Sequence, residues 1–521
     1  MRSILSYALA ICGVFGTPVA AVDAPGAGHI QTPRLLSDQL KQSLAEVRAS
    51  CVAVNAGGTA SGVIISPDGL VLTAAHVTRM AKEDAVFKIT LEDGRKAEAE
   101  LLGFNRETDF ALLKITEPGE VEWPHCELAE TSSVTGDFCF TVAHPAGRKK
   151  GRPAQVRMGR ITTHSLARGR PDYLFADCNI QPGDSGGPLF SMDGKLIGLD
   201  SSAAGILGFN IFPAIDQYHL DRERLEAGDR WGDREKSPDG PRFTKIELTP
   251  DAAEAVQAEF MRRLEMKYPP TLDFVQGLAN EEGEVTLNPQ VIVKHMTKAA
   301  LAIAKKQPLS LGLDDPSLTL ALDALPEDAV KGMPLVVDGE RVGYAVAVGP
   351  RHFLTKASLL GDGAEAGVRC DDGVRDVKML AKDEEWDLAL LGLGAGEKLK
   401  GIVWPEAPAT IKAGDLLVAR DHAGRLVWNV ATDEARPVTK AISAGPLEDK
   451  SIISGHRAPY PMAIRHALPL EARDAGTPVF DGSGELVGIH IARLSRTLGL
   501  ILPASALEER VGLLLEKVGD E

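Results

Sequence analysis

Three residues in the first half of the chain could together activate a nucleophile. His76, Asp109 and Ser185 occur in that order, each beside a predicted strand. A serine hydroxyl needs a base within hydrogen-bonding reach at neutral pH, and an imidazole suits that role because its ordinary pKa lies near neutrality. A buried carboxylate would hold that imidazole in the required tautomer. We therefore expect Ser185 as nucleophile, His76 as general base and Asp109 as the residue that orients the base.

The glycines around Ser185 predict a tight turn that could stabilise an oxyanion. Gly183, Gly186 and Gly187 flank the serine, so the backbone N–H groups of Gly183 and Ser185 can converge on one point. Each such donor is typically worth on the order of 10²–10³ in rate. The alternative interpretation is a glycine-rich hairpin beside a structural histidine. We favour the catalytic interpretation because three motifs occur together in the expected order.

The same order of motifs recurs in the second half of the chain. Segments similar to those that carry the three first-half residues are found around Ser358, Asp387 and Ala475. The offsets between the two sets are 282, 278 and 290 residues. Such regular spacing of three separate motifs indicates two copies of one domain.

The second copy lacks the groups that this chemistry needs. Ser358 stands where the base would be, Ala475 has no nucleophilic atom, and Thr477 replaces a glycine of the turn. His352 and His490 lie near the motifs, but histidines that flank strands are more often structural. We therefore expect a folded, non-catalytic domain suited to binding or regulation.

The spacing of apolar residues divides the chain into five parts. Short β-branched runs separated by Gly, Asp and Pro predict antiparallel β-structure after Cys51 and again after Met333. Apolar stripes at helical spacing predict helices between these regions and an amphipathic helix over Leu35 to Val47. We expect a mainly β fold with this organisation: 1–21 signal peptide, 22–50 N-terminal helical segment, 51–232 first β-domain, 233–332 helical connector, 333–521 second β-domain.

Composition and the N-terminal residues limit where the protein can be located and which partners it can have. A length of 521 residues predicts two or three domains, and a formal net charge of −16 argues against a surface for nucleic acid or anionic lipid. The basic stretch 148–152 is best interpreted as a solvated loop.

The N-terminal residues predict a signal peptide cleaved near Ala21. The pattern consists of Arg2, an apolar run from Ile4 to Phe15 and small residues before Val22. We expect an exported protein, periplasmic or secreted, without stable membrane insertion; a retained anchor is the alternative.

Six cysteines are present, and Cys12 would leave with the signal peptide. In an exported protein, four of the others could form two disulfides in three possible pairings, or they could remain buried thiols. The sequence leaves this choice open for Cys51, Cys126, Cys139 and Cys178, and Cys370 stands alone in the second half. No His/Cys spacing typical of zinc occurs, and we expect neither a metal nor a cofactor.

Taken together, these motifs resemble those of the trypsin-like serine peptidases, and among them the bacterial HtrA/Deg-type branch. The resemblance is carried by residues 61–69, by the TAAHV motif around His76, by TDFALLKI around Asp109 and by PGDSGGPLF around Ser185. It covers residues 51–232 closely and residues 333–510 more faintly. It implies two trypsin-like double β-barrel domains, the first active and the second a degenerate pseudoprotease. In each domain two six-stranded barrels would pack with the site in the cleft between them.

The resemblance also implies residues of a substrate pocket. Ser201 would help to line the cleft, and the segment that contains Gly208 and Asn210 would form a pocket wall. Asn179, six residues before Ser185, occupies the position where trypsin-like enzymes place the residue of the pocket floor. Because this side chain is uncharged, we expect a small or medium apolar side chain to be preferred over arginine or lysine.

Two functions from different classes fit these observations. The first is an exported serine endopeptidase that cleaves protein or peptide substrates through an acyl-enzyme, with a second domain for binding or regulation. The alternative is a latent or non-catalytic scaffold with a protease fold, because half of the duplicated machinery has been lost. Ester hydrolysis is less favoured, since the strand–turn–helix setting of a GxSxG elbow is absent. The oligomeric state stays open.

Overall fold

The structure is a computed structural model, and it describes most of the chain outside the N-terminal and central segments. The described residues are 33–55, 57–80, 85–116, 122–133, 136–148, 152–167, 170–203, 210–232, 332–361, 365–370, 373–394, 401–424, 426–439, 453–457 and 459–518. The predicted signal peptide (1–21), nearly all of the predicted helical connector (233–332) and Gly208 lie outside the described residues.

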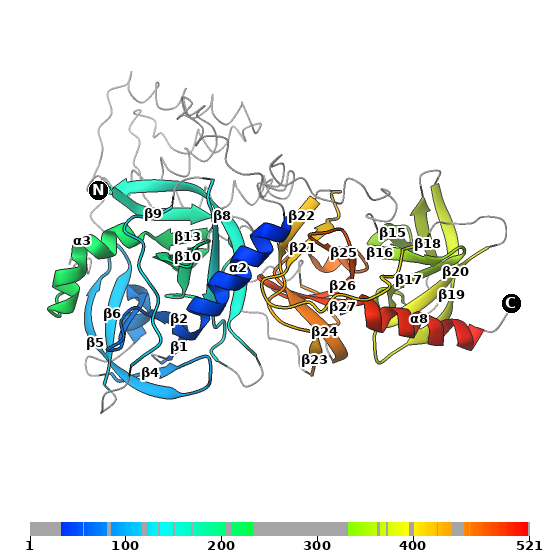
Figure 1. Cartoon of the computed structure of the whole chain (residues 1–521). Coiled ribbons are helices and arrows are strands. Elements are labelled where there is room, and N and C mark those ends of the chain that lie inside the picture. Colours follow the sequence, from blue (N-terminus) through cyan, green and yellow to red (C-terminus); the bar gives the residue numbers. More distant parts are fainter. Residues whose placement is uncertain are drawn as a thin grey trace, which may run out of the picture. The chain divides into compact units, whose positions relative to one another are not determined.

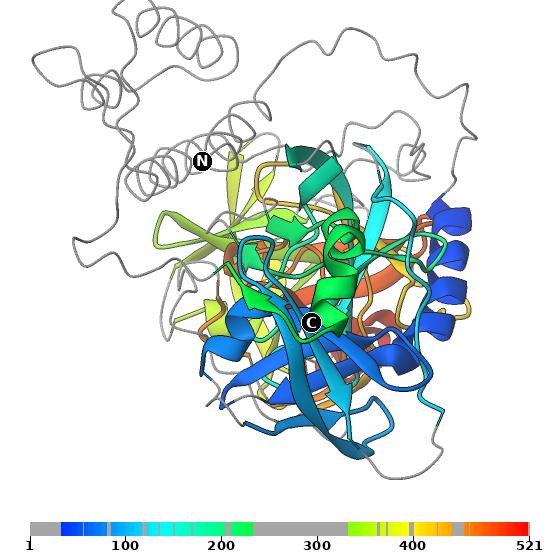
Figure 2. The ribbon, with the colours of Figure 1, turned by 90° about the vertical axis from the view of Figure 1, so that its left-hand side faces the viewer.

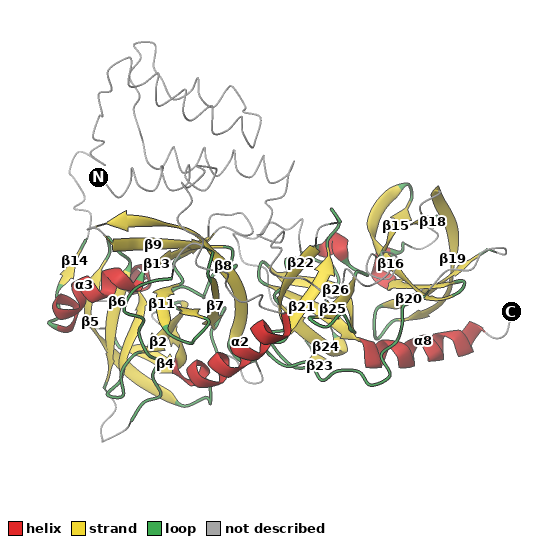
Figure 3. Ribbon diagram, turned by 45° about the horizontal axis from the view of Figure 1, so that its top comes forward, coloured by secondary structure: helices red, strands yellow, loops and turns green. Residues whose placement is uncertain are grey.

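The described chain forms two compact units (Figure 1). Unit 1 comprises Val47–Ala154 together with residues 159–232, and unit 2 comprises residues 33–46, 155–158 and 332–518. Strands make up most of the regular structure in both units (Figure 3). This confirms the mainly β fold expected from the sequence.

A six-stranded barrel forms the first half of unit 1. Its strands run in the order β5-β4-β1-β2-β3-β6, and pairing of β5 with β6 closes the barrel. Exposed and buried residues alternate along the first half of β5, as expected for a strand with one face toward a core. The strands are β1 (Cys51–Asn55), β2 (Thr59–Ile64), β3 (Leu70–Ala74), β4 (Phe87–Thr90), β5 (Lys96–Asn105) and β6 (Phe110–Ile115).

The second half of unit 1 is a seven-stranded sheet in the order β11-β10-β7-β8-β9-β13-β12. Helix α3 (Ile215–Glu226) packs on β5, β9 and β11 and so contacts both halves (Figure 2). The strands are β7 (Phe138–Ala143), β8 (Gln155–Ala167), β9 (Arg170–Ala176), β10 (Pro188–Ser191), β11 (Leu196–Leu199), β12 (Ser202–Ala203) and β13 (Asn210–Pro213), while β14 (Arg230–Trp231) adds in parallel to β5.

Unit 2 repeats this plan. A closed barrel in the order β15-β16-β17-β20-β19-β18 is followed by a seven-stranded sheet in the order β22-β21-β25-β26-β27-β24-β23. The barrel strands are β15 (Met333–Val337), β16 (Glu340–Gly349), β17 (His352–Lys356), β18 (Ala366–Cys370), β19 (Gly373–Asp383) and β20 (Leu388–Leu393). The sheet strands are β21 (Leu416–Arg420), β22 (Leu426–Val430), β23 (Arg436–Val438), β24 (Tyr460–His466), β25 (Pro478–Asp481), β26 (Leu486–Ser495) and β27 (Leu498–Pro503).

Two long helices belong to unit 2. Helix α8 (Ala504–Val518) packs on β19, β26 and β27, and every residue of β26 is buried because both faces of that strand are covered. Helix α2 (Pro33–Val47) occupies the segment expected to be amphipathic. It buries Leu36 and Leu40 completely. The Lys41 ammonium lies 2.8 Å from Asp415 Oδ1 of the same unit.

Short 3₁₀ helices stand at the positions that carry the candidate chemistry. In unit 1, η1 (Arg48–Ser50) precedes β1 and η2 (Ala75–Met80) follows β3 directly. In unit 2, η4 (Ala357–Leu359) follows β17 and η5 (Ala472–Asp474) precedes β25. The turns at the ends of β3 and β17, and those before β10 and β25, therefore occupy equivalent places in the two units.

Candidate active site

The imidazole of His76 is held against the carboxylate of Asp109. The ring Nδ1 lies 2.9 Å from Asp109 Oδ2 and 3.2 Å from Oδ1. The backbone N–H of His76 also donates to Oδ1 at 2.9 Å, and Ala75 N–H donates to the carbonyl of Asp109 at 2.9 Å. Asp109 has a positive φ of 60°, a conformation that aspartate tolerates better than most residues. Both the carboxylate and the backbone carbonyl of Asp109 are thus held by hydrogen bonds next to the imidazole.

A second side chain reaches the same carboxylate. The Ser201 hydroxyl donates to Asp109 Oδ2 at 2.6 Å. From the sequence this serine was expected in the cleft wall, and the structure adds a contact that spacing alone does not reveal. The two contacts on Oδ2 hold Nδ1 as the protonated ring nitrogen, because a carboxylate oxygen can only accept. The imidazole Nε2 is then left as the basic atom.

The turn that carries Ser185 is held by its own backbone and by the first barrel. Asp184 N–H donates to the Gln181 carbonyl at 3.0 Å, Gly187 N–H donates to the Asp184 carbonyl at 2.7 Å, and the Ser185 carbonyl accepts from Ser61 N–H at 2.9 Å. Within the described part of the chain, no bond is formed by the N–H of Gly183 or of Ser185. These donors are therefore available to a ligand.

Gly186 cannot carry a side chain in this turn. Its φ is +83°, and a Cβ on it would overlap Thr73 Oγ1 and lie 2.5 Å from the Ser61 carbonyl. Both contacts are with strands of the first barrel. The glycine therefore lets the serine turn of the second sheet rest directly on the barrel that carries His76 and Asp109.

Ser185 and His76 are not hydrogen-bonded to each other in this structure. Within the described residues the Ser185 hydroxyl has no hydrogen-bond partner, and the His76 ring bonds only Asp109. Catalytic hydrogen bonds are often long without substrate and shorten in the complex. The His76–Asp109 pair is thus formed, and the Ser185 hydroxyl is not bonded to it.

Two of the predicted pocket residues lie together. The Asn210 amide nitrogen lies 3.4 Å from Asn179 Oδ1 and 3.3 Å from the Ala176 carbonyl, and Asn210 Oδ1 accepts from Ile180 N–H at 3.4 Å. Asn179 is 6% exposed and Asn210 is fully buried. The side chains near Ser185 that were expected to form a pocket are therefore polar and uncharged. Gly208, the other expected wall residue, is not among the described residues.

Unit 2 repeats the backbone contacts of this site. Asp387 has a φ of 54°, its carbonyl accepts from Ala357 N–H at 2.8 Å, and its Oδ1 accepts from Ser358 N–H at 2.7 Å. Tyr344 N–H donates to the Ala475 carbonyl at 2.8 Å, as Ser61 does to Ser185 in unit 1. The three positions identified by their offsets in the sequence are thus equivalent in three dimensions.

A lysine replaces the imidazole as the partner of this second aspartate. Lys356 Nζ lies 2.8 Å from Asp387 Oδ2 and also donates to the His456 carbonyl at 3.0 Å and to the Tyr460 hydroxyl at 2.9 Å. The Ser358 hydroxyl donates to the same Oδ2 at 2.9 Å. Burial lowers the pKa of Lys356, while Asp387 acts in the opposite direction. Sequence reasoning missed Lys356; the available signal was a charged residue at the position of Ala74 in the first copy.

The turn before β25 contains a backbone hydrogen bond that the turn before β10 lacks. Residues Ala472–Asp474 form η5, and Ala475 N–H donates to the Ala472 carbonyl at 3.2 Å. The equivalent N–H in unit 1 belongs to Ser185 and is unused. Arg473 occupies the position of Gly183. The second copy therefore has one of its two candidate oxyanion donors bonded within the turn.

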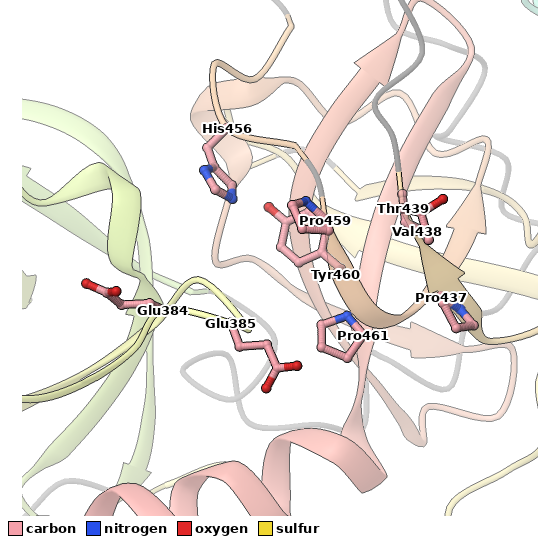
Figure 4. A pocket seen from close by; sticks show the side chains of 9 residues that line it. All are labelled: Glu384, Glu385, Pro437, Val438, Thr439, His456, Pro459, Tyr460 and Pro461. Atoms are coloured by element: carbon pink, nitrogen blue, oxygen red, sulfur yellow. The ribbon is translucent and has the colours of Figure 1, made fainter.

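A pocket of about 230 Å³ opens beside this cluster in unit 2 (Figure 4). Tyr460 and three prolines line it on one side, and two glutamates of the turn before β20 lie opposite, with the Glu384 side chain pointing away from Tyr460. Both glutamates are exposed. The lining residues are Glu384, Glu385, Pro437, Val438, Thr439, His456, Pro459, Tyr460 and Pro461.

Comparison with known families identifies one family along the chain. The family model of the trypsin-like peptidase domain matches residues 60–199 and, a second time, residues 343–489. A putative serine protease HhoA of Synechocystis is 35% identical over 180 residues, which cover 33% of this chain and 44% of that protein. A probable periplasmic DegP-like serine endoprotease of Halomonas elongata is 34% identical over 164 residues, 30% of this chain and 32% of that protein.

These curated relatives are matched over less than half of their own length. Among solved structures, the serine endoprotease from Yersinia pestis matches with 23% identity and a TM-score of 0.31. That match covers 42% of this chain and 77% of the other.

Proposed function

The chain belongs to the trypsin-like peptidase family, and from this premise we propose that it is an exported serine endopeptidase. Peptide bonds would be cleaved through an acyl-enzyme at Ser185. The observation that carries the proposal is the paired His76 and Asp109, 2.9 Å apart, beside a serine turn with two unused N–H groups. Family membership makes serine peptidase chemistry the first expectation for such a site.

Each residue of the site has a role in this mechanism. His76 Nε2 removes the proton from the Ser185 hydroxyl as its oxygen attacks the scissile carbonyl, and later returns that proton to the leaving amine. Asp109 stabilises the imidazolium, and Ser201 holds Asp109. The N–H groups of Gly183 and Ser185 receive the negative charge that develops on the carbonyl oxygen. Water then hydrolyses the acyl-enzyme with His76 again acting as the base.

We propose protein or peptide substrates with a small or medium apolar side chain before the cleaved bond. The support is the uncharged pair Asn179 and Asn210, because a strict preference for arginine or lysine needs a carboxylate at the pocket floor. Nucleic acid is not an expected partner, since the formal net charge of −16 opposes it.

Export after cleavage near Ala21 is part of the same proposal. Its support is the signal-peptide pattern of the first 21 residues and the word periplasmic in the names of several relatives. Among the helices that the structure describes, none is long and apolar enough to cross a bilayer.

We propose that unit 2, over residues 333–521, is a pseudoprotease that serves in binding or regulation. Three differences from unit 1 support this: Ala475 lacks a nucleophilic atom, Lys356 occupies the aspartate, and the Ala475 N–H is bonded within its own turn. The pocket beside Tyr460 offers a surface where a ligand could bind.

A latent scaffold is the second candidate, and one observation favours it. The missing hydrogen bond between Ser185 and His76 is the geometry that a resting enzyme or a silent fold would have. In this case the first unit would hydrolyse peptides only after a partner or substrate moves the serine turn.

Labelling with a fluorophosphonate tests the proposal. The purified mature protein should be labelled at Ser185 and should digest unfolded casein, and the S185A variant should do neither. S191A, which removes a hydroxyl of β10 that bonds Asp193 rather than any of the proposed site residues, is the matched control and should behave as the wild type. A folded protein that reacts with neither probe would support the latent scaffold, and undiminished casein cleavage by S185A would refute the role of Ser185.

A further inference from the structure

Four buried cysteines of unit 1 take no part in the proposed chemistry. Cys51, Cys139 and Cys178 are completely buried and Cys126 is 4% exposed. None of these four, nor the half-buried Cys370 of unit 2, forms a disulfide in the structure. Two disulfides among these four could pair in three ways, and the arrangement of the strands distinguishes between them.

Cys51 and Cys126 meet where β1 begins. Cys51 pairs across the sheet with Val63 of β2. One residue further along β2, the Ile64 carbonyl accepts a hydrogen bond from Cys126 N–H at 3.0 Å. Cys126 therefore bonds to β2 next to the first residue pair of β1 and β2, at the position that Ser50 would occupy if β1 began one residue earlier. Both thiols are buried. Burial raises the pKa of Cys51 most, and the charge of Cys126 raises it further, as expected for two sulfurs that lie close together.

Cys139 and Cys178 meet over a glycine of β8. Ile161 N–H donates to the Asp137 carbonyl at 2.9 Å, and β7 runs beside β8 in the sheet. Counting two residues along each strand from this bond places Cys139 opposite Gly159, with its side chain on the face to which a Gly159 Cβ would point. A Cβ at Gly159 would lie 2.5 Å from the Cys178 nitrogen and 2.8 Å from its Cα. Cys178 thus occupies the space above Gly159, directly beside Cys139.

We propose that this chain forms two disulfides, Cys51–Cys126 and Cys139–Cys178, when it folds in an oxidising compartment. In each reaction two thiols lose two protons and two electrons and form one S–S bond. The electrons and protons pass to a small disulfide oxidant of the glutathione class, which is reduced to two thiols. The occurrence of these bonds in the cell rests on the export proposed above, whereas the pairing rests on the fold of unit 1.

The bonds must form before the core of unit 1 closes. A thiolate is the reactive species, and burial raises the pKa of the Cys126 thiol to about 12 and that of Cys51 and Cys139 well above their ordinary value. A folded, reduced unit 1 therefore resists both oxidation and alkylation. The four cysteines therefore keep the oxidation state, thiol or disulfide, that they reach during folding.

One of the two bonds would support the candidate active site. Cys178 precedes Asn179 and stands seven residues before Ser185. A covalent link from Cys178 to β7 would tie the start of the serine turn to the centre of its sheet. The other link would tie β1 of the first barrel to the segment that leads into the second sheet.

Peptide mapping without reduction tests the pairing. Full-length protein from the oxidising compartment is alkylated under denaturing conditions at acidic pH and then digested with pepsin, which limits disulfide exchange. We expect cross-linked peptides for Cys51–Cys126 and Cys139–Cys178, with Cys370 alkylated. Other pairings, or alkylation of all five cysteines, would overturn the proposal.

Refolding in vitro separates the pairing from export. The same chain is unfolded, reduced and refolded in a mixture of reduced and oxidised glutathione, then mapped in the same way. The two predicted cross-links support the pairing whatever the compartment, and free thiols or other pairs contradict it. If the cross-links appear only after refolding in vitro, the pairing is right and the proposal that the bonds form in the cell is wrong. Export itself is tested separately, by whether the chain is recovered from the oxidising compartment at all.

Substitutions provide a second readout that does not depend on peptidase activity. Reduction during refolding should lower the urea midpoint of the wild-type protein, and C51A/C126A should show a smaller drop because only one bond remains to be lost. C370A is the matched control and should lose as much as the wild type. An equal midpoint for reduced and oxidised wild-type protein would overturn the proposal.

Discussion

The ammonium of Lys356 lies 2.8 Å from Asp387 Oδ2, and the two side chains are only 3% and 5% exposed. In unit 1 the equivalent aspartate, Asp109, is paired with His76. In the second copy Ser358 stands at the position of His76, and the basic groups near the buried carboxylate are His456, with Nε2 at 3.7 Å, and the closer Lys356. Lys356 reaches it from two positions earlier in the chain than Ser358, so its ammonium balances the charge of the carboxylate.

Replacing Lys356 by methionine should therefore destabilise unit 2. Removing one partner of a buried ion pair typically costs about 3–5 kcal/mol, because the remaining charge is left uncompensated. Urea unfolding of the full chain, followed by tryptophan fluorescence that includes Trp386 beside Asp387, measures the change. K356M/D387N, which removes both charges, is the matched variant and should recover most of the loss. A cost below about 1 kcal/mol for K356M alone would show that the pair contributes little.

Restoring the missing side chains should not restore reactivity in unit 2. In an S185A background, S358H/A475S supplies an imidazole and a hydroxyl, but Lys356 still holds Asp387 and Arg473 still stands in the turn. We expect no fluorophosphonate labelling of this variant. A label at position 475 would show that the closed turn opens readily, and that the two lost side chains alone explain the loss of activity.

The sequence predicted that His76 pairs with Asp109 in unit 1, but it did not predict every contact that holds this pair. His76, Asp109 and Ser185 were identified because each lies in a motif beside a strand. Both features can be recognised from residues that are neighbours in the sequence. The contact of Ser201 with Asp109 joins residues 92 positions apart, and no local pattern encodes it. Lys356 was overlooked for the same reason: its partner Asp387 lies in the turn before β20, and only the folded barrel brings the two together.

The N-terminal helix shows the same limit. Its apolar spacing predicted an amphipathic helix, and the helix is present over Pro33–Val47. Its partners are more than 370 residues away in the chain: Ser37 donates to the Gly414 carbonyl, and Lys41 pairs with Asp415. Periodicity identifies the face of a helix that will be buried, but it does not identify what covers that face.

Replacing Ser201 by alanine should lower kcat without changing the fold. The Ser201 hydroxyl donates to Asp109 Oδ2 at 2.6 Å, and a hydrogen bond to a charged group is typically worth about 1.5–3 kcal/mol. We expect a fall in kcat of about tenfold or more, together with a shift in the acidic limb of the pH profile, because Asp109 then faces His76 differently. S201T, which keeps a hydroxyl, should restore much of the rate. An unchanged pH profile in S201A would make the contact merely structural.

Replacing Gly186 by alanine should damage unit 1 more than its backbone conformation alone explains. Its φ of +83° is one cost, of about 1–2 kcal/mol for a residue with a Cβ. Overlap with Thr73 and Ser61 is a second cost. Gly94 has a similar φ of +93° with nothing within 4 Å of its Cβ position, so G94A is the matched control for the first cost. Denaturant unfolding and casein digestion of both variants separate the two, and equal losses would show that the turn can move away from β3.

Two buried histidines of unit 2 predict that its stability depends on pH. Leu468 N–H donates to His466 Nδ1 at 3.1 Å, so the ring proton of His466 lies on Nε2 and is donated to His490 Nδ1 at 3.0 Å. His490 Nε2 then donates to the Glu471 carbonyl at 3.2 Å. Both rings are neutral in this chain of bonds, and protonating either one would place two hydrogens on the same contact.

The surroundings of these histidines reinforce their neutral state. Burial lowers the pKa of His490 to about 4 and that of His466 well below its ordinary value of 6.5. Arg493 and Lys356 act in the same direction on His490, and Asp474 opposes them. Because the folded-state pKa values are depressed, the unfolded chain binds more protons below pH 6.5. The stability that is present at neutral pH is therefore lost progressively as the pH falls from about 6.5 toward 4.

Urea unfolding of the full chain at pH 7 and at pH 5 measures this effect. At about 1.4 kcal/mol per pH unit, His490 alone should cost about 2 kcal/mol between those two values. H466Q/H490Q keeps groups that can donate and accept in the same places but cannot be protonated, and it should lose less stability over the same interval. H352Q, which replaces a more exposed histidine of the same unit, should retain the dependence seen in the wild type. If H466Q/H490Q and the wild type lose equal stability between pH 7 and pH 5, the pair is not the source of the pH dependence.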